Sequence, residues 1–234
     1  FSHATSLDLN MGCHHLELSP NSKELCTIVL PFGKFEHQRI PMGLCNGPDI
    51  FQERMYELFS DLEDVRAYID DLLLTSCGSF EDHLFCLERL FSRLLNAGLK
   101  VNAKKSHFCM PEVEYLGYWI TRHGIKPITK KVDAIQNMAP PKTRRQLRSF
   151  LGMVNYYRDM WKHRSDTLAP LTRLSSKTIP FKWTDIEQTA FDAVKKVVCK
   201  DVLLAYPDFS KPFHIHTDAS KLQLGAVISQ NEKV

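Results

Sequence analysis

The stretch "VRAYIDDLLLTS", Val65–Ser76, places two adjacent carboxylates, Asp70 and Asp71, between apolar runs. Short apolar runs of this kind predict two strands joined by a tight turn. Neighbouring side chains on a strand point to opposite faces, so both carboxylates face one way only at a turn. Charged groups are seldom buried unless they are paired or bind a metal ion. Two interpretations follow: the aspartates cap their own backbone in the turn, or they bind divalent cations.

A third carboxylate for such a cation site is Asp8, which stands between Leu7 and Leu9 in the strand-like segment "SLDLN". Magnesium prefers oxygen ligands, usually one or two carboxylates together with substrate phosphates. Two such ions about 4 Å apart stabilise the attacking and the leaving oxygen of an in-line phosphoryl displacement. The three aspartates are therefore candidate ligands for two Mg²⁺ ions, or for Mn²⁺ in their place.

The composition is that of a soluble globular protein of 234 residues, with 44% hydrophobic residues, 24% charged residues and a net charge of +3. This mild positive charge neither requires nor excludes a nucleic-acid partner. The seven cysteines form no C-x-x-C pair, which indicates reduced thiols rather than a disulfide framework or a zinc site. No apolar run has the length of a membrane span and no signal peptide opens the chain, so we expect an intracellular protein of the cytoplasm or nucleus without a membrane partner. Phe1 at the start and a strand-like pattern at the end predict a fragment of a longer chain.

The first half of the chain alternates strand and helix signals. Strands are expected in "SLDLN", "HHLEL" and "CTIVLPF", with "SPNSKE" as a polar turn. A helix is expected from Pro48 onward, since apolar residues recur at helical spacing in "DIFQERMYELFSDL". Ser79 and Asp82 form a capping-box pattern for another helix, which Gly98 ends. Strands then follow in "LKVNAKKSHF" and "VEYLGYWIT".

In the second half, Pro140 and Pro141 end a short helix, and Thr143 with Gln146 caps the next. The segment "LSSKTIPFKW" is a candidate linker before a helix from about Asp185 to Cys199. The tail "KPFHIHTDASKLQLGAVISQ" predicts a β-hairpin. The fold class that follows is α+β.

The segment 142–164 is strongly basic, with seven lysines and arginines against one acid, Asp159. Tyr156, Tyr157 and Trp161 are interleaved with these basic residues. Lysine and arginine neutralise phosphates, and aromatic rings stack on bases or pack on sugars. The alternative is a solvated helix face whose aromatic residues lie in the core. Both interpretations fit the pattern. The basic positions are Lys142, Arg144, Arg145, Arg148, Arg158, Lys162 and Arg164.

Nine blocks of the sequence together resemble the reverse transcriptase of gypsy-type (Metaviridae-like) long-terminal-repeat retrotransposon polyproteins. They stand in the order of that family across nearly the whole chain, which makes the resemblance specific although each block alone is weak. The blocks are "LDLNMGCHH", "IPMGLCNGPDIFQE", "YIDDLLL", "VNAKKSHF", "VEYLGYWIT", "LRSFLGMVNYYR", "LAPLT", "FKWT" and "HTDASKLQLGAVISQ".

The resemblance implies a right-hand polymerase palm and thumb followed by a truncated RNase H-like α/β segment. Its divisions on this chain are the palm with residual fingers at 1–118, the thumb at 119–175, the connection at 176–205, and the first hairpin of the RNase H-like domain at 206–234. The fingers segment that normally precedes Asp8 is absent from the sequence.

The implied activity is RNA-directed DNA polymerisation, in which Asp8, Asp70 and Asp71 are catalytic and hold two Mg²⁺ ions. The implied partners are an RNA or DNA template-primer, deoxynucleoside triphosphates and the rest of the polyprotein, while the oligomeric state stays open. The alternative is a catalytically inactive nucleic-acid-binding remnant of such a polymerase.

The same resemblance implies roles for further residues. Either Lys104 or Lys105 stands where the family carries a lysine near the outgoing pyrophosphate, or both belong to a solvated strand end. Phe51 stands in the helix beneath the nucleotide, or is a core residue. The nucleotide- and template-binding set is Cys13, Met42, Gly43, Asn46, Gln52, Tyr68 and Lys105; the primer grip is Tyr115, Leu116, Gly117 and Tyr118; the nucleic-acid-binding basic helix carries Arg144, Arg145, Arg148 and Arg158.

Several positions depart from the family pattern and indicate a diverged or decaying copy. Cys13 replaces the aromatic residue that excludes the ribose 2′-hydroxyl, so discrimination against ribonucleotides is in doubt. Met42 stands where phenylalanine is usual, Gly47 replaces alanine, and Asp49 puts a charge where a small residue is usual.

The C-terminal "HIHTDAS" resembles the first strand of an RNase H domain, with Asp218 at its first catalytic carboxylate. His214 and His216 share a strand face with Asp218, a spacing that fits either a metal site or ordinary strand packing. Because the chain ends at Val234, before the other carboxylates of that site, we expect no nuclease activity.

Overall fold

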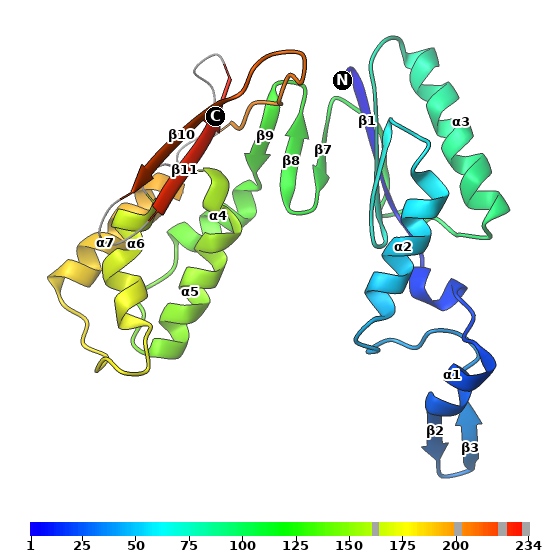
Figure 1. Ribbon diagram of the computed structural model, residues 1–234, viewed down its shortest axis with the longest axis horizontal. Coiled ribbons are helices and arrows are strands. Elements are labelled where there is room, and N and C mark those ends of the chain that lie inside the picture. The colour runs from blue at the N-terminus through cyan, green and yellow to red at the C-terminus, as the bar shows by residue number, and fades with distance from the viewer. Residues whose placement is uncertain (161–163, 199–202, 220–223, 231–234) are drawn as a thin grey trace. The chain divides into compact units, whose positions relative to one another are not determined.

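Figure 1 shows the computed structural model of the chain, which describes residues 1–160, 164–198, 203–219 and 224–230. The chain divides into two compact units, Phe1–Leu116 and Gly117–Val234. Each unit has a hydrophobic core of its own.

The first unit is built on a four-stranded antiparallel sheet in the order β4-β5-β1-β6. The strands are β1 (His3–Asp8), β4 (Val65–Tyr68), β5 (Asp71–Ser76) and β6 (His107–Met110). β1 and β5 are the two central strands, and consecutive residues of both are buried: Ala4–Leu7 on β1 and Leu72–Leu74 on β5. The strand pair predicted around Asp70 and Asp71 is confirmed as the hairpin β4–β5.

Two helices supply the rest of this core. α2 (Gly47–Phe59) contributes Phe51 and Met55, and α3 (Phe80–Asn96) contributes Leu90 and Leu94 to the cluster that holds the apolar side chains of β5. α3 begins with the predicted capping box, since the Ser79 hydroxyl accepts from the Asp82 amide and the Asp82 carboxylate accepts from the Ser79 amide. Both helices therefore form where their apolar spacing predicts them.

Two predictions for the first 45 residues are wrong. "HHLEL" forms no strand, because Gly12–His15 make a 3₁₀ helix, η1, and Glu17 makes only an isolated bridge to Arg39. "SPNSKE" is not a polar turn but the short helix α1 (Pro20–Leu25). Its Ser19 accepts from the Ser22 amide and its proline stands in the first turn, a local cap that outweighs the loop-like composition.

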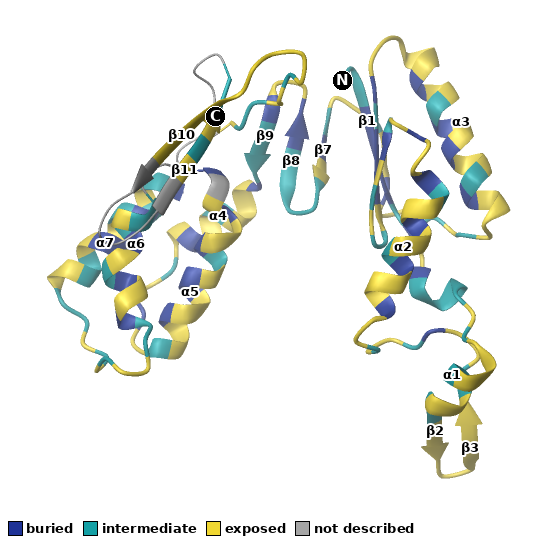
Figure 2. Ribbon diagram, in the orientation of Figure 1, coloured by how far each residue is buried: buried dark blue, intermediate teal, exposed yellow. Residues whose placement is uncertain are grey.

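The hairpin of β2 (Thr27–Leu30) and β3 (Gly33–Glu36) leaves apolar side chains in solvent. Val29 is 79% exposed and Phe32 is 78% exposed, and Figure 2 shows this hairpin almost entirely in the colour of exposed residues. Two strands alone cannot bury an apolar face, so the hairpin adds nothing to the core of its unit.

The second unit is mainly helical. Phe150 and Phe191 lie at its centre with their ring centroids 4.6 Å apart, and side chains of four helices surround them. The sequence patterns did not predict α6, since Pro170 lies inside it and proline normally interrupts a helix. The helices are α4 (Thr129–Gln136), α5 (Arg144–Tyr156), α6 (Arg164–Leu174) and α7 (Asp185–Val198), with the 3₁₀ turn η2 at Arg158–Met160.

The remaining described strands follow β6 along the chain. The chain passes from β7 (Glu112–Tyr115) through a turn to the hairpin of β8 (Tyr118–Thr121) and β9 (Gly124–Pro127). The predicted C-terminal hairpin is confirmed as β10 (His214–Ala219) and β11 (Leu224–Ser229). Within the part of the chain that is described, no helix combines the length and the apolar character needed to cross a bilayer.

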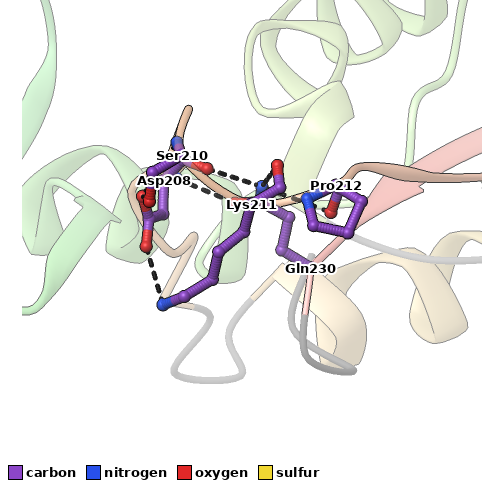
Figure 3. Close-up of polar contacts among 5 residues, drawn as sticks. All are labelled: Asp208, Ser210, Lys211, Pro212 and Gln230. Carbon is purple, nitrogen blue, oxygen red and sulfur yellow. Dashed lines mark hydrogen bonds and ion pairs between the residues drawn. The ribbon is translucent and has the colours of Figure 1, made fainter.

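Gln230, directly after β11, ties the end of this hairpin to the loop before β10 (Figure 3). Its side-chain amide donates to the Asp208 carbonyl at 2.8 Å, and its carbonyl oxygen accepts from the Asp208 amide at 2.8 Å. The Asp208 carboxylate in turn accepts from Ser210 and pairs with Lys211 at 2.7 Å, and these contacts lower the pKa of Asp208 to about 2.

A buried histidine joins the sheet of the first unit to α3. His83 is fully buried, its Nε2 lies 2.8 Å from the Thr5 hydroxyl, and its Nδ1 lies 2.7 Å from the Ser76 hydroxyl. Thr5 also accepts from the Cys109 amide, so the network spans β1, β5, β6 and α3. Burial, and then the neighbouring His3, lower the pKa of His83 below 6.5.

This lowered pKa makes the stability of the first unit dependent on pH. Below pH 6.5 the unfolded chain binds a proton at His83 that the folded chain does not bind, so the free energy of unfolding falls as the pH decreases. The slope from this one group is at most about 1.4 kcal/mol per pH unit. Urea unfolding between pH 8 and pH 5 measures it. His83→Gln should flatten the slope and exposed His107→Gln should not; equal slopes in wild type and His83→Gln would contradict the prediction.

Candidate active site

The antiparallel register between β1 and β5 brings the predicted carboxylates together. Asp8, the last residue of β1, is the direct partner of Asp71, the first residue of β5. Asp71 also pairs with Tyr68 across a two-residue turn formed by Ile69 and Asp70. The Leu9 amide donates to the Asp70 carbonyl at 2.8 Å, which fixes the turn against the end of β1. Three aspartates thus gather at one end of the central strand pair.

The carboxylates repel one another in partly buried surroundings. The pKa of Asp70 is raised by burial and then by Asp8 and Asp71. The pKa of Asp71 is raised by burial and by Asp8, while Lys105 acts in the opposite direction. Lys105 Nζ lies 3.5 Å from the Asp8 carboxylate, so one cation already offsets part of the negative charge. A further positive charge at this site would be stabilised for the same reason.

The donor set fits a hard divalent cation. All three side chains offer carboxylate oxygens, and one Asp70 oxygen, Oδ1, is buried without a hydrogen-bond partner. An unsatisfied buried oxygen is costly unless a cation or donor reaches it. The described residues contain no group of three His, Cys, Asp or Glu side chains already gathered around a common point.

Comparison with known proteins places the chain in a family. Residues 2–120, just over half of the chain, match the reverse transcriptase (RNA-dependent DNA polymerase) family. The chain belongs to the reverse transcriptase family. Residues 183–234 match a second family, the RNase H-like domain found in reverse transcriptase.

Similar sequences are Pol polyproteins of transposons. The chain is 40% identical over 228 residues to the retrovirus-related Pol polyprotein from transposon 412 of Drosophila melanogaster, which covers 96% of this chain. It is 33% identical over 240 residues to the Pol polyprotein from transposon gypsy of the same organism, covering 97% of this chain. The chain spans only 18% and 23% of those two polyproteins.

A solved structure with the same fold is the foamy viral protease-reverse transcriptase in complex with double-stranded DNA. The TM-score is 0.87 at 25% sequence identity, and the match covers 98% of this chain and 44% of that one. The predicted fold class, a reverse-transcriptase fold with an RNase H-like segment, is thereby confirmed.

The residues predicted to contact the nucleotide lie on several elements of the first unit. Cys13 is half-buried in η1, and Asp70 is close enough to contribute to the raised pKa of its thiol, after burial. Tyr68 is exposed at the end of β4, directly before the carboxylate turn. Of the two candidate lysines, Lys105 forms the ion pair with Asp8.

The segment that leads into α2 is the most open part of the predicted nucleotide set. Met42 is 80% exposed, Gly43 has a φ of 98°, and Asn46 caps α2 without a side-chain hydrogen bond. Phe51 is fully buried, which agrees with the core alternative. Gln52 does not point into open space: its amide hydrogen-bonds to Ala67 of β4 and to Ile69 of the turn that also holds Asp70.

The predicted primer grip falls on the tight turn between β7 and β8. Leu116 and Gly117 both have positive φ, 46° and 77°, as a two-residue hairpin turn requires. Tyr115, in the first unit, has its hydroxyl 3.5 Å from the Asp71 carbonyl, and burial raises its pKa to about 12. Tyr118, in the second unit, stacks on Tyr156 with centroids 5.4 Å apart.

The sequence left two alternatives for the basic helix, a nucleic-acid-binding face or a solvated face whose aromatic residues lie in the core, and its arginines differ in their contacts. Arg144 donates to the Ile179 carbonyl and Arg148 donates to the Ser175 carbonyl at 2.7 and 3.1 Å, so both hold α5 to the loop after α6. Arg145 and Arg158 are exposed.

Of the aromatic residues in that segment, Tyr157 is buried at 2% exposure, while Tyr156 is 44% exposed and carries Lys131 Nζ 4.7 Å from its ring centroid. Trp161 and Lys162 lie outside the described residues.

The RNase H-like residues lie on the C-terminal hairpin. Asp218 belongs to β10, but its side chain lies outside what the structure describes. His214 and His216 are both exposed, and His216 Nε2 lies 3.2 Å from the Ser229 hydroxyl on β11. Among described side chains no metal-ligating group of three includes them.

Sequence reasoning missed Gly12 as part of the site. A Cβ atom on this buried glycine would lie 2.1 Å from Asp70 Oδ1 and 2.5 Å from Phe51 Cζ. The Asp70 carboxylate therefore packs directly on the backbone at Gly12. The sequence showed only a glycine four residues after Asp8. The need for glycine there becomes clear only when the β4–β5 turn packs against it.

Replacement of Gly12 by alanine should destabilise the first unit and displace the Asp70 carboxylate. Overpacking of this kind costs about 1–3 kcal/mol in the free energy of unfolding. Gly152→Ala is the control, because nothing lies within 4 Å of a Cβ at that helical position and alanine should stabilise α5 by up to about 1 kcal/mol. Urea unfolding measures both variants; a Gly12→Ala protein as stable as wild type would show that the site tolerates the extra carbon.

Proposed function

We propose that this chain carries the palm and thumb of an RNA-directed DNA polymerase, as part of a retrotransposon Pol polyprotein. The single observation that carries the proposal is the β1–β5 register, which sets Asp8 opposite Asp71 and beside Asp70. Membership of the reverse transcriptase family supports it. The domain divisions proposed are 1–118 for the palm with residual fingers, 119–175 for the thumb, 176–205 for the connection and 206–234 for the RNase H-like hairpin.

The reaction proposed is attack of a primer 3′-hydroxyl on the α-phosphate of an incoming deoxynucleoside triphosphate, with pyrophosphate as the leaving group. Asp8, Asp70 and Asp71 would hold two Mg²⁺ ions, or Mn²⁺ in their place. When bound, these cations neutralise the charge that develops on the attacking and leaving oxygens. The contribution of the protein is positioning and electrostatic complementarity, since phosphoryl transfer needs little covalent chemistry from side chains.

Lys105 would leave Asp8 when the cations and the triphosphate bind. Its side chain is exposed and its ion pair is 3.5 Å long, so little free energy is lost by releasing it. A lysine beside the first aspartate is then available to the phosphates of the nucleotide or to the outgoing pyrophosphate.

The proposed partner is a template-primer duplex. The foamy viral protein of similar fold is bound to double-stranded DNA. Exposed Arg145 on α5 supplies positive charge for phosphates, whereas Arg144 and Arg148 are engaged by carbonyls of their own unit. The rest of the polyprotein is the other proposed partner.

A second candidate function is nucleic-acid binding without catalysis. It is favoured by Cys13 in place of the expected aromatic residue and by Met42, 80% exposed, where a family phenylalanine is usual.

Primer extension separates the two functions. Wild type should incorporate deoxynucleotides in the presence of Mg²⁺, and Asp70→Asn should reduce the rate by at least about 10³-fold, because one charged ligand of the site is lost. Glu63→Gln, which neutralises an exposed carboxylate in the same unit, should retain the wild-type rate. Salt-sensitive duplex binding with no extension by wild type would favour the remnant.

Ribonucleotide discrimination should depend on Cys13. A small thiol leaves space where the family carries an aromatic ring, so wild type should accept ribonucleotides more readily than Cys13→Tyr or Cys13→Phe. Discrimination is the ratio of kcat/KM for a deoxyribonucleotide to kcat/KM for the matching ribonucleotide. We expect this ratio to rise by about tenfold or more in the aromatic variants. Cys13→Ser controls for loss of the thiol. Equal ratios in all four folded proteins would show that residue 13 does not contact the 2′-position of the nucleotide.

Arg145 and Arg148, both on α5, should have separable effects. Arg145→Ala should weaken duplex binding and lower the slope of log K against log salt by about 1, with unchanged stability. Arg148→Ala should lower the free energy of unfolding by about 1 kcal/mol, because two hydrogen bonds to the Ser175 carbonyl are lost. Fluorescence anisotropy from low to high salt measures duplex binding by both variants, and urea unfolding measures their stability. Loss of stability in Arg145→Ala together with weaker binding by a stable Arg148→Ala would contradict both assignments.

A further inference from the structure

We propose that Lys131 binds a backbone phosphate of the primer strand, beside the turn at Gly117. The inference rests on the polymerase function proposed above, since that function supplies the template-primer duplex. It adds a residue of α4 to the basic positions that the sequence pattern singled out in the segment 142–164. Lys131, Gly117 and the tyrosines around them belong to the second unit, where β8, α4 and α5 carry them or lie next to them (Figure 1).

Three tyrosines, Tyr118, Tyr156 and Tyr157, form a tyrosine cluster that supports Lys131. The rings of Tyr118 and Tyr156 are stacked, with centroids 5.4 Å apart and an angle of 14° between their planes. The ring of Tyr157 stands edge-on to both of them. The Tyr118 hydroxyl donates to the Tyr156 carbonyl at 2.8 Å. The Tyr157 hydroxyl donates to the Gly117 carbonyl at 3.4 Å, so the cluster fixes the start of β8 against the end of α5.

The ammonium group of Lys131 is held at one side of this cluster. Its Nζ lies 4.7 Å from the centroid of the Tyr156 ring, which is a cation–π contact. A Cβ atom built on Gly117 would lie 2.6 Å from Lys131 Nζ and 2.2 Å from the Tyr156 hydroxyl oxygen. The ammonium group and the hydroxyl therefore converge on the bare Cα of Gly117. Polar groups so close together can contact oxygen atoms of the same phosphate.

The positive charge of Lys131 faces solvent. Its side chain is exposed, and within the described residues no carboxylate or carbonyl oxygen accepts from its ammonium group. Lys195 of the same unit differs, because it also lies over a ring, that of Phe191, but donates to the Met138 carbonyl at 2.9 Å. Contact with the face of a ring leaves the N–H donors of Lys131 available to an acceptor outside the protein.

The turn beside Lys131 is open to a strand of nucleic acid. Gly117 has a φ of 77° and carries no side chain, so the backbone there can be approached closely. A side chain at this position would be strained and would collide with both Lys131 and Tyr156. The resemblance assigns this turn to the primer grip. The strand that reaches Lys131 is therefore the primer.

A purely structural role for Lys131 makes a different prediction. In that role the ammonium group stabilises the tyrosine cluster and binds no phosphate. Loss of the charge would then lower the stability of the second unit without changing how duplex binding depends on salt or on any single phosphate. Stability alone does not separate the two roles, whereas the response to one phosphate does.

Two neutral variants, one charged variant and one control test the inference. Lys131→Met and Lys131→Gln remove the charge and keep a long side chain, and Lys131→Arg keeps the charge. Lys130→Met is the matched control, because it removes one positive charge from the neighbouring exposed lysine, which points about 100° away around α4. Far-UV circular dichroism and urea unfolding establish that each protein is folded before its binding is compared.

The first measurement is fluorescence anisotropy of a labelled template-primer duplex from low to high salt. In Lys131→Met the slope of log K against log salt should fall by about 1, and affinity at about 0.1 M salt should fall about tenfold. Lys131→Gln should behave alike, and Lys131→Arg should bind like wild type.

The second measurement locates the phosphate. Duplexes carry one uncharged methylphosphonate at each position of either strand in turn. At one primer phosphate the replacement should weaken binding by wild type and by Lys130→Met about tenfold, but binding by Lys131→Met less than about twofold, because the partner of that phosphate is already lost.

The outcomes separate failure of the inference from failure of the proposed function. If every methylphosphonate weakens Lys131→Met by the same factor as wild type, Lys131 binds no particular phosphate and the inference is overturned. A coupled phosphate on the template strand would overturn the assignment to the primer. Absence of duplex binding by wild type at low salt would overturn the inference together with the proposed partner. A wild type that binds the duplex but extends no primer contradicts the polymerase proposal alone, and the methylphosphonate scan still decides the role of Lys131.

Discussion

The site depends first on the pairing of β1 with β5. In an antiparallel pair each residue has one direct partner, and here the partner of Asp8 is Asp71. A shift of one residue would turn every side chain of β1 to the other face and separate the carboxylates. The register is held by buried residues on both strands, among them Leu7, Leu72 and Leu74, and by the hydroxyl–histidine network of Thr5, Ser76 and His83. The hydrophobic core therefore sets the geometry of the charged site.

The same pairing brings several energetically unfavourable features together at the carboxylate turn. Contacts with the surrounding residues offset part of their cost in free energy. Burial and then repulsion between the carboxylates raise the pKa of Asp70 and Asp71, an Asp70 oxygen has no hydrogen-bond partner, and Ile69 adopts a conformation that β-branched residues avoid. Strain of this kind costs on the order of 1–3 kcal/mol for a residue and tends to cluster where function demands it. The Lys105 ion pair, the bare backbone of Gly12 and the Gln52 amide are the compensating features within the first unit.

The pattern of apolar residues predicted most elements of the fold, and the reasons for its failures are local. The capping box at Ser79 and the hairpin around Asp70 are short-range signals, and both are confirmed. "HHLEL" alternates like a strand but forms η1, since no neighbouring strand pairs with it beyond one bridge at Glu17. α6 was not predicted because Pro170 normally interrupts a helix. The helix forms nevertheless, since the leucines on one of its faces are buried in the core. Propensity is a weak prior, and packing decides such cases.

By itself the sequence determined the family, because ordered blocks of residues remain recognisable even where individual positions have changed. It also predicted Asp8, Asp70 and Asp71 as the candidate site. Only the tertiary structure decided what their neighbours do. It tied Gln52 to the turn, engaged Arg144 and Arg148 with carbonyls, and placed Gly12 against Asp70. These contacts join residues distant in the chain, and their hydrogen bonds and steric limits exist only once the strands and helices pack. Residue type sets which chemistry is available, and packing sets which atoms meet.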